Sequence, residues 1–121
     1  MPTITVSFPY NPAMSENARL GYSPRNGKMY AQSGYKQAKA NLALVIAFAK
    51  ASKQTTFAPR LRVWVDLRVY GPSHRFDASN LVKSTNGAIS SAIGVNDSLF
   101  DGSYRGFVDK KNPRFEITIN Q

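Results

Sequence analysis

Between residues 60 and 70 the chain alternates strictly between two kinds of side chain, and this pattern dictates the local structure. Every second position is aliphatic, namely Leu61, Val63, Val65, Leu67 and Val69. The positions between them carry Arg60, Arg62, Trp64, Asp66, Arg68 and Tyr70. Because successive side chains of a β-strand point to opposite faces, a period of two predicts a strand with one apolar face. Gly71 and Pro72 end it.

Two other stretches have the three-and-four spacing of amphipathic helices. The first is expected from Tyr35 to Lys50, with the apolar positions Tyr35, Ala38, Leu42, Val45 and Ala49. The second is expected to run to Ile93 from Asp77 or Ser79, either of which can cap a helix. Its buried stripe would be Leu81, Thr85, Ala88, Ile89 and Ala92, and Gly94 would end it.

Shorter segments near the two ends of the chain complete the set of elements. Ile4 to Phe8 alternates and predicts a strand. Residues 11–32 show no clear periodicity and are interpreted as a long basic loop. Tyr104–Asp109 and Arg114–Asn120 are interpreted as the two strands of a hairpin.

The resulting order is strand, helix, strand, helix, strand, strand. It predicts an α+β fold with a mixed sheet and two helices packed on one face. A length of 121 residues is that of one domain, so residues 1–121 are expected to form a single unit.

The composition narrows the functional class. The net charge is +9, from 16 Lys and Arg against 7 Asp and Glu, which favours nucleic acid as partner, with an acidic membrane surface second. No basic helix with a large apolar face supports the membrane alternative. The absence of cysteine excludes disulfides and thiolate chemistry, and His74 as sole histidine excludes a His-rich metal site. No signal peptide is evident, so a cytoplasmic location is expected.

One segment concentrates the residues that could carry chemistry. It reads Arg75-Phe-Asp-Ala-Ser-Asn-Leu-Val-Lys83 and is followed by Asn96-Asp97. Asp77 lies at the helix entry, Lys83 about one and a half turns further in, and Asp97 just past the helix end. Mg²⁺ is often held by one or two carboxylates, with phosphate and water as the other ligands. The structural alternatives are a helix cap at Asp77, worth about 1 kcal/mol, a solvated Lys83 and a simple turn at Asp97.

This segment resembles the RusA-like family of Holliday junction resolvases, whose motif reads Asp-x-Asp-Asn-Leu-x-Lys with a further aspartate after the helix. Asp77, Asn80, Lys83 and Asp97 match that motif, and Ser79 stands at the middle aspartate. The resemblance covers most of the chain in element order. It implies a homodimeric endonuclease that cuts four-way DNA junctions by paired nicks and uses Mg²⁺, or Mn²⁺. Such proteins are often encoded by phages.

The resemblance also implies roles for single residues. Asp77 and Asp97 would bind the metal, and Lys83 would act with them at the scissile phosphate. Ser79 removes one carboxylate, so we expect weaker or altered metal binding. Asp101 and Asp66 are candidates for a replacement ligand, whereas Asn80 would hydrogen-bond the aspartate or fix the loop.

The remaining positive charge is interpreted as a DNA-binding surface. Its members are Arg75, Lys36 and Lys39, together with Arg19, Arg25 and Lys28 of the basic loop. No base-reading helix is evident, so recognition would follow DNA shape. Two other functions stay open: a catalytically weak or inactive binder of branched DNA, and a single-stranded nucleic-acid-binding module that stacks bases on Trp64, Tyr70 and the loop tyrosines.

Overall fold

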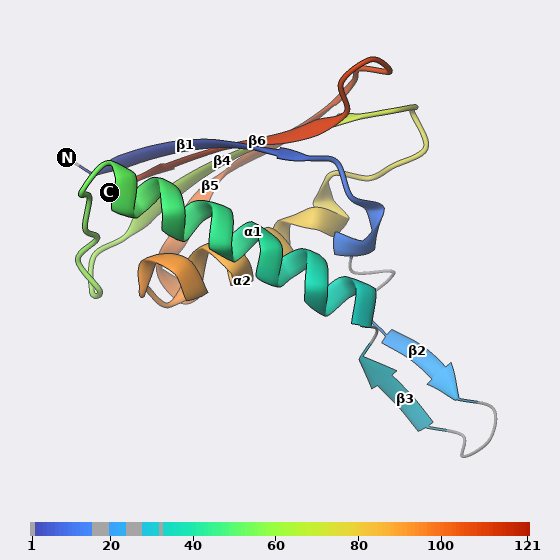
Figure 1. Ribbon diagram of the computed structural model, residues 1–121, viewed down its shortest axis with the longest axis horizontal. Coiled ribbons are helices and arrows are strands. Elements are labelled where there is room, and N and C mark those ends of the chain that lie inside the picture. The colour runs from blue at the N-terminus through green and yellow to red at the C-terminus, as the bar shows by residue number, and fades with distance from the viewer. Residues whose placement is uncertain (1, 16–19, 24–27, 32) are drawn as a thin grey trace.

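The computed structural model of this chain describes residues 2–15, 20–23, 28–31 and 33–121. Its main sheet has the strand order β1-β6-β4-β5. The strands are β1 (Thr3–Pro9), β4 (Val63–Gly71), β5 (Phe100–Val108) and β6 (Arg114–Asn120). Helices α1 (Ser33–Ser52) and α2 (Ser79–Ile93) both lie on one side of this sheet (Figure 1). The predicted α+β class and the order of the main elements are confirmed.

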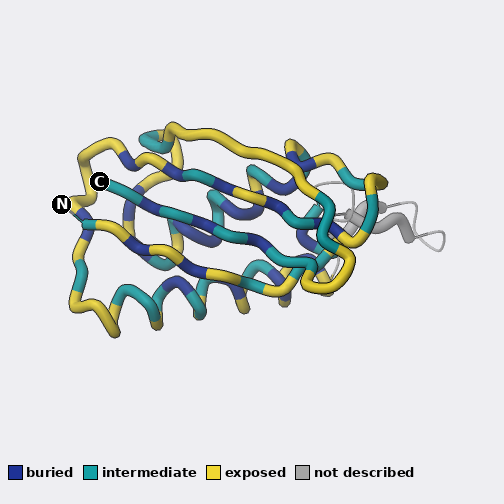
Figure 2. Tube along the Cα trace, turned by 90° about the horizontal axis from the view of Figure 1, so that it is seen from above, coloured by how far each residue is buried: buried dark blue, intermediate teal, exposed yellow. Residues whose placement is uncertain are grey.

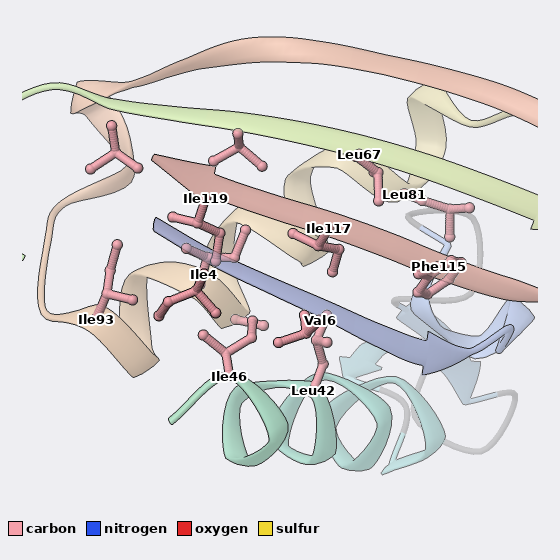
Figure 3. Packing of buried hydrophobic residues seen from close by; sticks show 14 of the residues in the cluster. Ile4, Val6, Leu42, Ile46, Leu67, Leu81, Ile93, Phe115, Ile117 and Ile119 are labelled. Carbon is pink, nitrogen blue, oxygen red and sulfur yellow. The ribbon is translucent and has the colours of Figure 1, made fainter. Parts of the chain in front are cut away.

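The alternation in β4 has the expected consequence for burial. Val63, Val65, Leu67 and Val69 are buried, while Trp64 and Arg68 between them are exposed. The same period buries Phe115, Ile117 and Ile119 of β6 completely. These side chains meet Leu42 and Ile46 of α1 and the inner residues of α2 in one apolar core, shown in Figure 3. The strand begins at Val63 rather than Arg60.

Helix α2 is held in place by its buried side. Leu81, Ala88, Ile89 and Ile93 belong to the core. The hydroxyl of Ser84 is also buried, and it donates to the carbonyl of Met14 at 2.6 Å. Gly94 ends the helix with a φ of 73°, a conformation that glycine adopts without steric cost. The helix therefore lies where the spacing of its apolar residues predicts.

The expected hairpin of the last two strands is wrong. β5 pairs with β4, in parallel, and β6 pairs antiparallel with both β4 and β1. β4 therefore separates the two strands, and the connection after β5 passes the end of β4, where the N–H of Asp109 donates to Gly71 at 2.9 Å. The reason is that β4, α2 and β5 form a parallel crossover unit, and closeness in sequence does not choose a strand's partner.

The expected loop over residues 11–32 is also wrong in part. It contains a 3-10 helix, η1 (Pro12–Met14), and the strands β2 (Leu20–Ser23) and β3 (Lys28–Ala31), which pair antiparallel outside the main sheet (Figure 1). Strands of four residues are too short to show an alternation clearly, which explains why the sequence pattern did not predict them. Within the described part of the chain, no helix has the length and apolarity needed to cross a membrane.

Strand β5 differs from the other strands of the sheet. It lies at the end of the strand order, with β4 as its only partner among the described residues. Seven of its nine residues, Asp101 to Phe107, are exposed. Figure 2 looks onto the helix-free face and shows this exposed edge as a nearly continuous run. The sheet thus ends in a long strand whose outer edge is open to a partner.

Candidate active site

Asp77 immediately precedes α2 and is fixed there by Ser79. Its carboxylate oxygen Oδ1 accepts the backbone N–H of Ser79 at 3.0 Å and the Ser79 hydroxyl at 2.7 Å. The first of these bonds is the usual capping interaction at a helix start, although the helix geometry itself begins at Ala78. The N-cap residue is Ala78 and not Asp77. Asp77 precedes it and binds the first helical residue, while its own side chain remains exposed.

These bonds change the acidity of the carboxyl group. The hydroxyl of Ser79, and next its N–H, stabilise the ionised form and lower the pKa of Asp77 below its ordinary value. The two hydrogen bonds from Ser79 thus favour the ionised form of Asp77. The serine that stands at the motif's middle aspartate is thus a hydrogen-bond donor to Asp77 and not an additional anion.

Two pockets meet at Asp77. One has a volume of about 490 Å³, and its lining includes Arg75, Asn80 and Asp77. The other, of about 440 Å³, places Asp77 beside His74 and β5 residues 104–108. The side chain of Phe76 is part of both linings. Asp77 therefore stands between two open spaces, with a cationic side chain and an amide on one side.

His74 and Arg105 are residues that the sequence pattern did not single out for this place. They line the second pocket only because β5 runs parallel to β4 and brings its last residues beside the start of α2. The ring of Phe76 occupies the space that a side chain at Gly106 or Gly71 would need. These two glycines allow the segment before α2 to lie against the sheet, and no local pattern signals that contact.

Lys83 lies on the exposed side of α2, one turn beyond Asn80. The same helix face continues to Gly87, where the ammonium group of Lys39 from α1 occupies the position that a Cβ atom would take. Lys39 is half-buried by this contact, and Lys36 of α1 is exposed. Two lysines from different helices therefore lie along one face of α2. This arrangement suits a ligand with successive negative charges, such as a phosphate backbone.

Asp97 lies at the opposite end of α2 from Asp77. It begins the 3-10 helix η3 (Asp97–Leu99), which leads into Phe100, whereas Asp77 is flanked by Phe76 and Ala78, both packed at Gly106. The 15 residues of α2, at about 1.5 Å each, separate the two ends by roughly 22 Å. Within one chain, the two motif aspartates are not brought together.

The two candidate replacement ligands also lie away from Asp77. Asp66 faces the helix-free side of the sheet, where it accepts from the Ser103 hydroxyl at 2.9 Å and lies 3.4 Å from Arg68. Asp101 is next to Trp64 at the start of β5 and accepts from the N–H of Gly102 at 2.8 Å. Among the described residues no three His, Asp or Glu side chains form a metal-binding group.

The expected DNA contacts are only partly placed. Arg75 is exposed and lines the same pocket as Asn80. Arg19 and Arg25 lie outside the described residues, and for Lys28 only its place in β3 is described. Of the predicted DNA-binding surface, Arg75 and Lys36 are thus exposed and Lys39 is half-buried.

Comparison with known proteins shows which family has this sequence. The family model of the endodeoxyribonuclease RusA matches residues 9–120. This match contains Asp77, Lys83 and Asp97, and it extends over β4, β5 and both helices. A search of curated proteins returns no match.

Proposed function

The chain belongs to the RusA endodeoxyribonuclease family, and we propose that it resolves four-way DNA junctions by paired, Mg²⁺-dependent nicks as a homodimer. Family membership supports an endonuclease acting on DNA. The net charge of +9 and the exposed Arg75 and Lys83 support the polyanionic substrate. One geometric observation, the open edge of β5, supports the dimer, and the dimer in turn would bring the two metal-binding carboxylates together.

A second copy of the chain can complete the sheet at this edge. β5 exposes a row of unpaired backbone N–H and C=O groups, and pairing them with the same strand of another copy would satisfy both rows. About a twofold axis the two β5 strands run antiparallel. The Phe100 end of one strand then lies beside the Val108 end of the other, in a sheet that is continuous across both copies.

This pairing would bring Asp77 of one subunit close to an Asp97, although the two residues lie far apart within one chain. Asp97 precedes Phe100, and Asp77 lies at Gly106, near the other end of the strand. Each Asp77 would therefore approach Asp97 of the partner subunit, and the dimer would hold two identical sites. Two sites related by a twofold axis suit a junction in which two strands are cut in a symmetric way.

Each composite site has the donors that a hard cation prefers. Asp77 and the partner's Asp97 would hold Mg²⁺. When bound, the metal would polarise a phosphoryl oxygen of the substrate and activate a water molecule for attack. Ser79 orients the Asp77 carboxylate through its two hydrogen bonds. Lys83 would stabilise the charge that builds up on the phosphate in the transition state, and Arg75 would bind a neighbouring phosphate.

A second function is favoured by Ser79 itself. Its hydroxyl is committed to Asp77 at 2.7 Å, so the composite site would contain one carboxylate fewer than the family motif. A branched-DNA-binding protein with weak or absent catalysis is the function that follows if the two remaining carboxylates bind the metal too weakly.

The decisive experiment mixes two inactive variants. In a composite site, the heterodimer of Asp77→Asn with Asp97→Asn contains one site with both substitutions and one intact site. We expect each variant alone to be inactive on a synthetic four-way junction in Mg²⁺ or Mn²⁺, and the mixture to nick one strand. Linear duplex DNA serves as substrate control.

The matched control mixes wild type with the double variant Asp77→Asn/Asp97→Asn. Every site of that heterodimer carries one substitution, so this mixture should lose activity in proportion to heterodimer formation. Failure of the two single variants to complement, with wild type active, would refute the composite site. Tight junction binding without cleavage by wild type, with cleavage appearing in Ser79→Asp, would establish the binding function instead.

A further inference from the structure

The helix-free face of the main sheet carries exposed aromatic and arginine residues, and Figure 2 looks onto this face. Trp64 is 49% exposed and Phe107 is 36% exposed. Large aromatic side chains gathered on one open face indicate a ligand that covers them. We call this surface the aromatic–arginine face, and it consists of Trp64, Arg68 and Tyr70 on β4, Arg105 and Phe107 on β5, and Arg114 on β6.

Three side chains from neighbouring strands are stacked at one end of this face. The guanidinium of Arg114 lies 3.9 Å from the centre of the Tyr70 ring. The rings of Tyr70 and Phe107 are 4.9 Å apart with an angle of 17° between their planes. Ion pairs of 2.8 Å to Asp109 and Glu116 hold Arg114 in place. The stack is therefore preorganised, and Phe107, next to the open edge, is its free end.

Two arginines lie side by side between this stack and Trp64. Arg68 and Arg105 are register partners on adjacent strands, where like charges repel each other. Glu116 of β6 is the register partner of Arg68 on its other side. Asp66 lies 3.4 Å from Arg68, whose side chain stays 51% exposed. In the part of the chain that the structure describes, no carboxylate forms an ion pair with Arg105. An anion such as a backbone phosphate would relieve the repulsion.

We propose that the aromatic–arginine face binds single-stranded DNA, with bases stacked on Phe107 and Trp64 and phosphates on Arg68 and Arg105. Trp64 and Tyr70 are six positions apart on β4, a distance of about 20 Å that several nucleotides can span. Sequence-tolerant single-strand binding uses this combination of stacking rings and interleaved cations. DNA is favoured over a protein partner because exposed rings alternate with Arg105, which forms no ion pair among the described residues.

This face adjoins the junction-cleaving site, because Arg105 and Phe107 also line the pocket beside Asp77. The aromatic–arginine face lies on the opposite side of the sheet from α2, which carries Ser79 and Lys83. Pairing of two β5 edges would leave it open, because strand pairing uses the edge and not the face. In a dimer the two faces would be neighbours across the twofold axis. Such a surface would fit the unpaired DNA strands that occur at a branch point.

Fluorescence offers a direct test, because Trp64 is the only tryptophan of the chain. Titration with an oligothymidylate in EDTA at low salt should quench its emission in a saturable way. Phe107→Ala should weaken the affinity about tenfold by removing one stacked base. Arg105→Gln should lower the salt slope by about 0.7 by removing one phosphate contact. Circular dichroism checks that both variants are folded.

The matched control is Phe48→Ala, which removes a 75% exposed ring from α1, on the other side of the sheet. Its affinity for the oligonucleotide should equal that of wild type. Unchanged affinity and salt slope in both face variants, or no quenching at all, would overturn the proposal. Asp77→Asn should bind the oligonucleotide normally, so a failure of junction cleavage and a failure of single-strand binding are measured independently.

Discussion

Ser79 donates both its N–H and its hydroxyl to one oxygen of Asp77. A single residue thus both begins the helix and lowers the pKa of the carboxylate that we propose as a metal ligand. An aspartate at this position would offer a second anion, but its side chain could not donate a hydrogen bond when ionised. Compared with the family motif, Ser79 removes one negative charge from the site. It adds a hydroxyl donor that orients Asp77 and lowers the pKa of Asp77.

Replacing Ser79 by alanine should raise the pKa of Asp77 toward the ordinary value for aspartate. The hydroxyl bond is the largest cause of the lowered pKa, and the N–H bond remains. Because the folded-state pKa is lowered, the stability that it provides is present at neutral pH and is lost as pH falls through the folded pKa. The part of the stability difference between wild type and Ser79→Ala that comes from this hydrogen bond should therefore disappear in acid, while the difference in helix propensity remains.

NMR titration of the Asp77 carboxyl carbon measures this pKa directly in both proteins. Ser79→Thr, which keeps the hydroxyl, is the matched control and should leave the pKa low. An equal pKa in wild type and Ser79→Ala would mean that the hydroxyl bond does not persist in solution.

At the scale of elements, β5 depends on one backbone position near its start. Gly102 has a φ of 153°, and a Cβ atom there would overlap the carbonyl of Val65 on β4. β5 can therefore approach β4 closely only because this residue has no side chain. The position of Asp97 and the course of the open edge both follow from that contact.

Gly102→Ala should lower the free energy of unfolding by about 2–3 kcal/mol, through steric overlap and backbone strain. Gly94→Ala is an informative control, because it adds a Cβ at a φ of 73° with nothing within 4 Å. It should cost only about 1 kcal/mol. Denaturant unfolding measures both values, and equal losses would show that the contact with Val65 is not the cause.

At the scale of the whole molecule, the two ends of α2 carry the two motif aspartates, so one chain has the parts of a site in two places. A twofold assembly through β5 would join these parts without any change within a chain. It would also cover the most exposed backbone edge of the sheet. The catalytic site would then form only when two chains assemble.

Tyr104 provides a test of this assembly, because it is the central residue of β5 and is 50% exposed. In a symmetric antiparallel pair it would lie next to its own counterpart. Tyr104→Arg would set like charges opposite each other and weaken the dimer. Sedimentation equilibrium should give twice the chain mass of 13.4 kDa for wild type and one chain mass for Tyr104→Arg, which should also lose junction cleavage.

Tyr104→Phe is the conservative control and should remain dimeric and active. A monomeric wild type that cleaves junctions, or a Tyr104→Arg variant that stays dimeric, would exclude β5 as the interface.

Local patterns predicted the parts of this protein that depend on near neighbours in the chain. The period of two in β4 and the spacing of three and four in α1 and α2 reflect burial on one side of each element, which neighbouring residues already encode. The motif from Asp77 to Lys83 is local as well, and it predicted the family that the comparison confirmed.

The tertiary structure alone decided which strands pair and where Asp97 lies relative to Asp77. Strand pairing is a choice among distant partners, and nothing in the residues of β5 itself selects β4 over β6. Because β5 joins β4 in parallel, α2 runs from one end of the pair to the other, and the aspartates before and after the helix are carried apart. Separation across a helix is a property of three-dimensional distance, which spacing along the chain does not express.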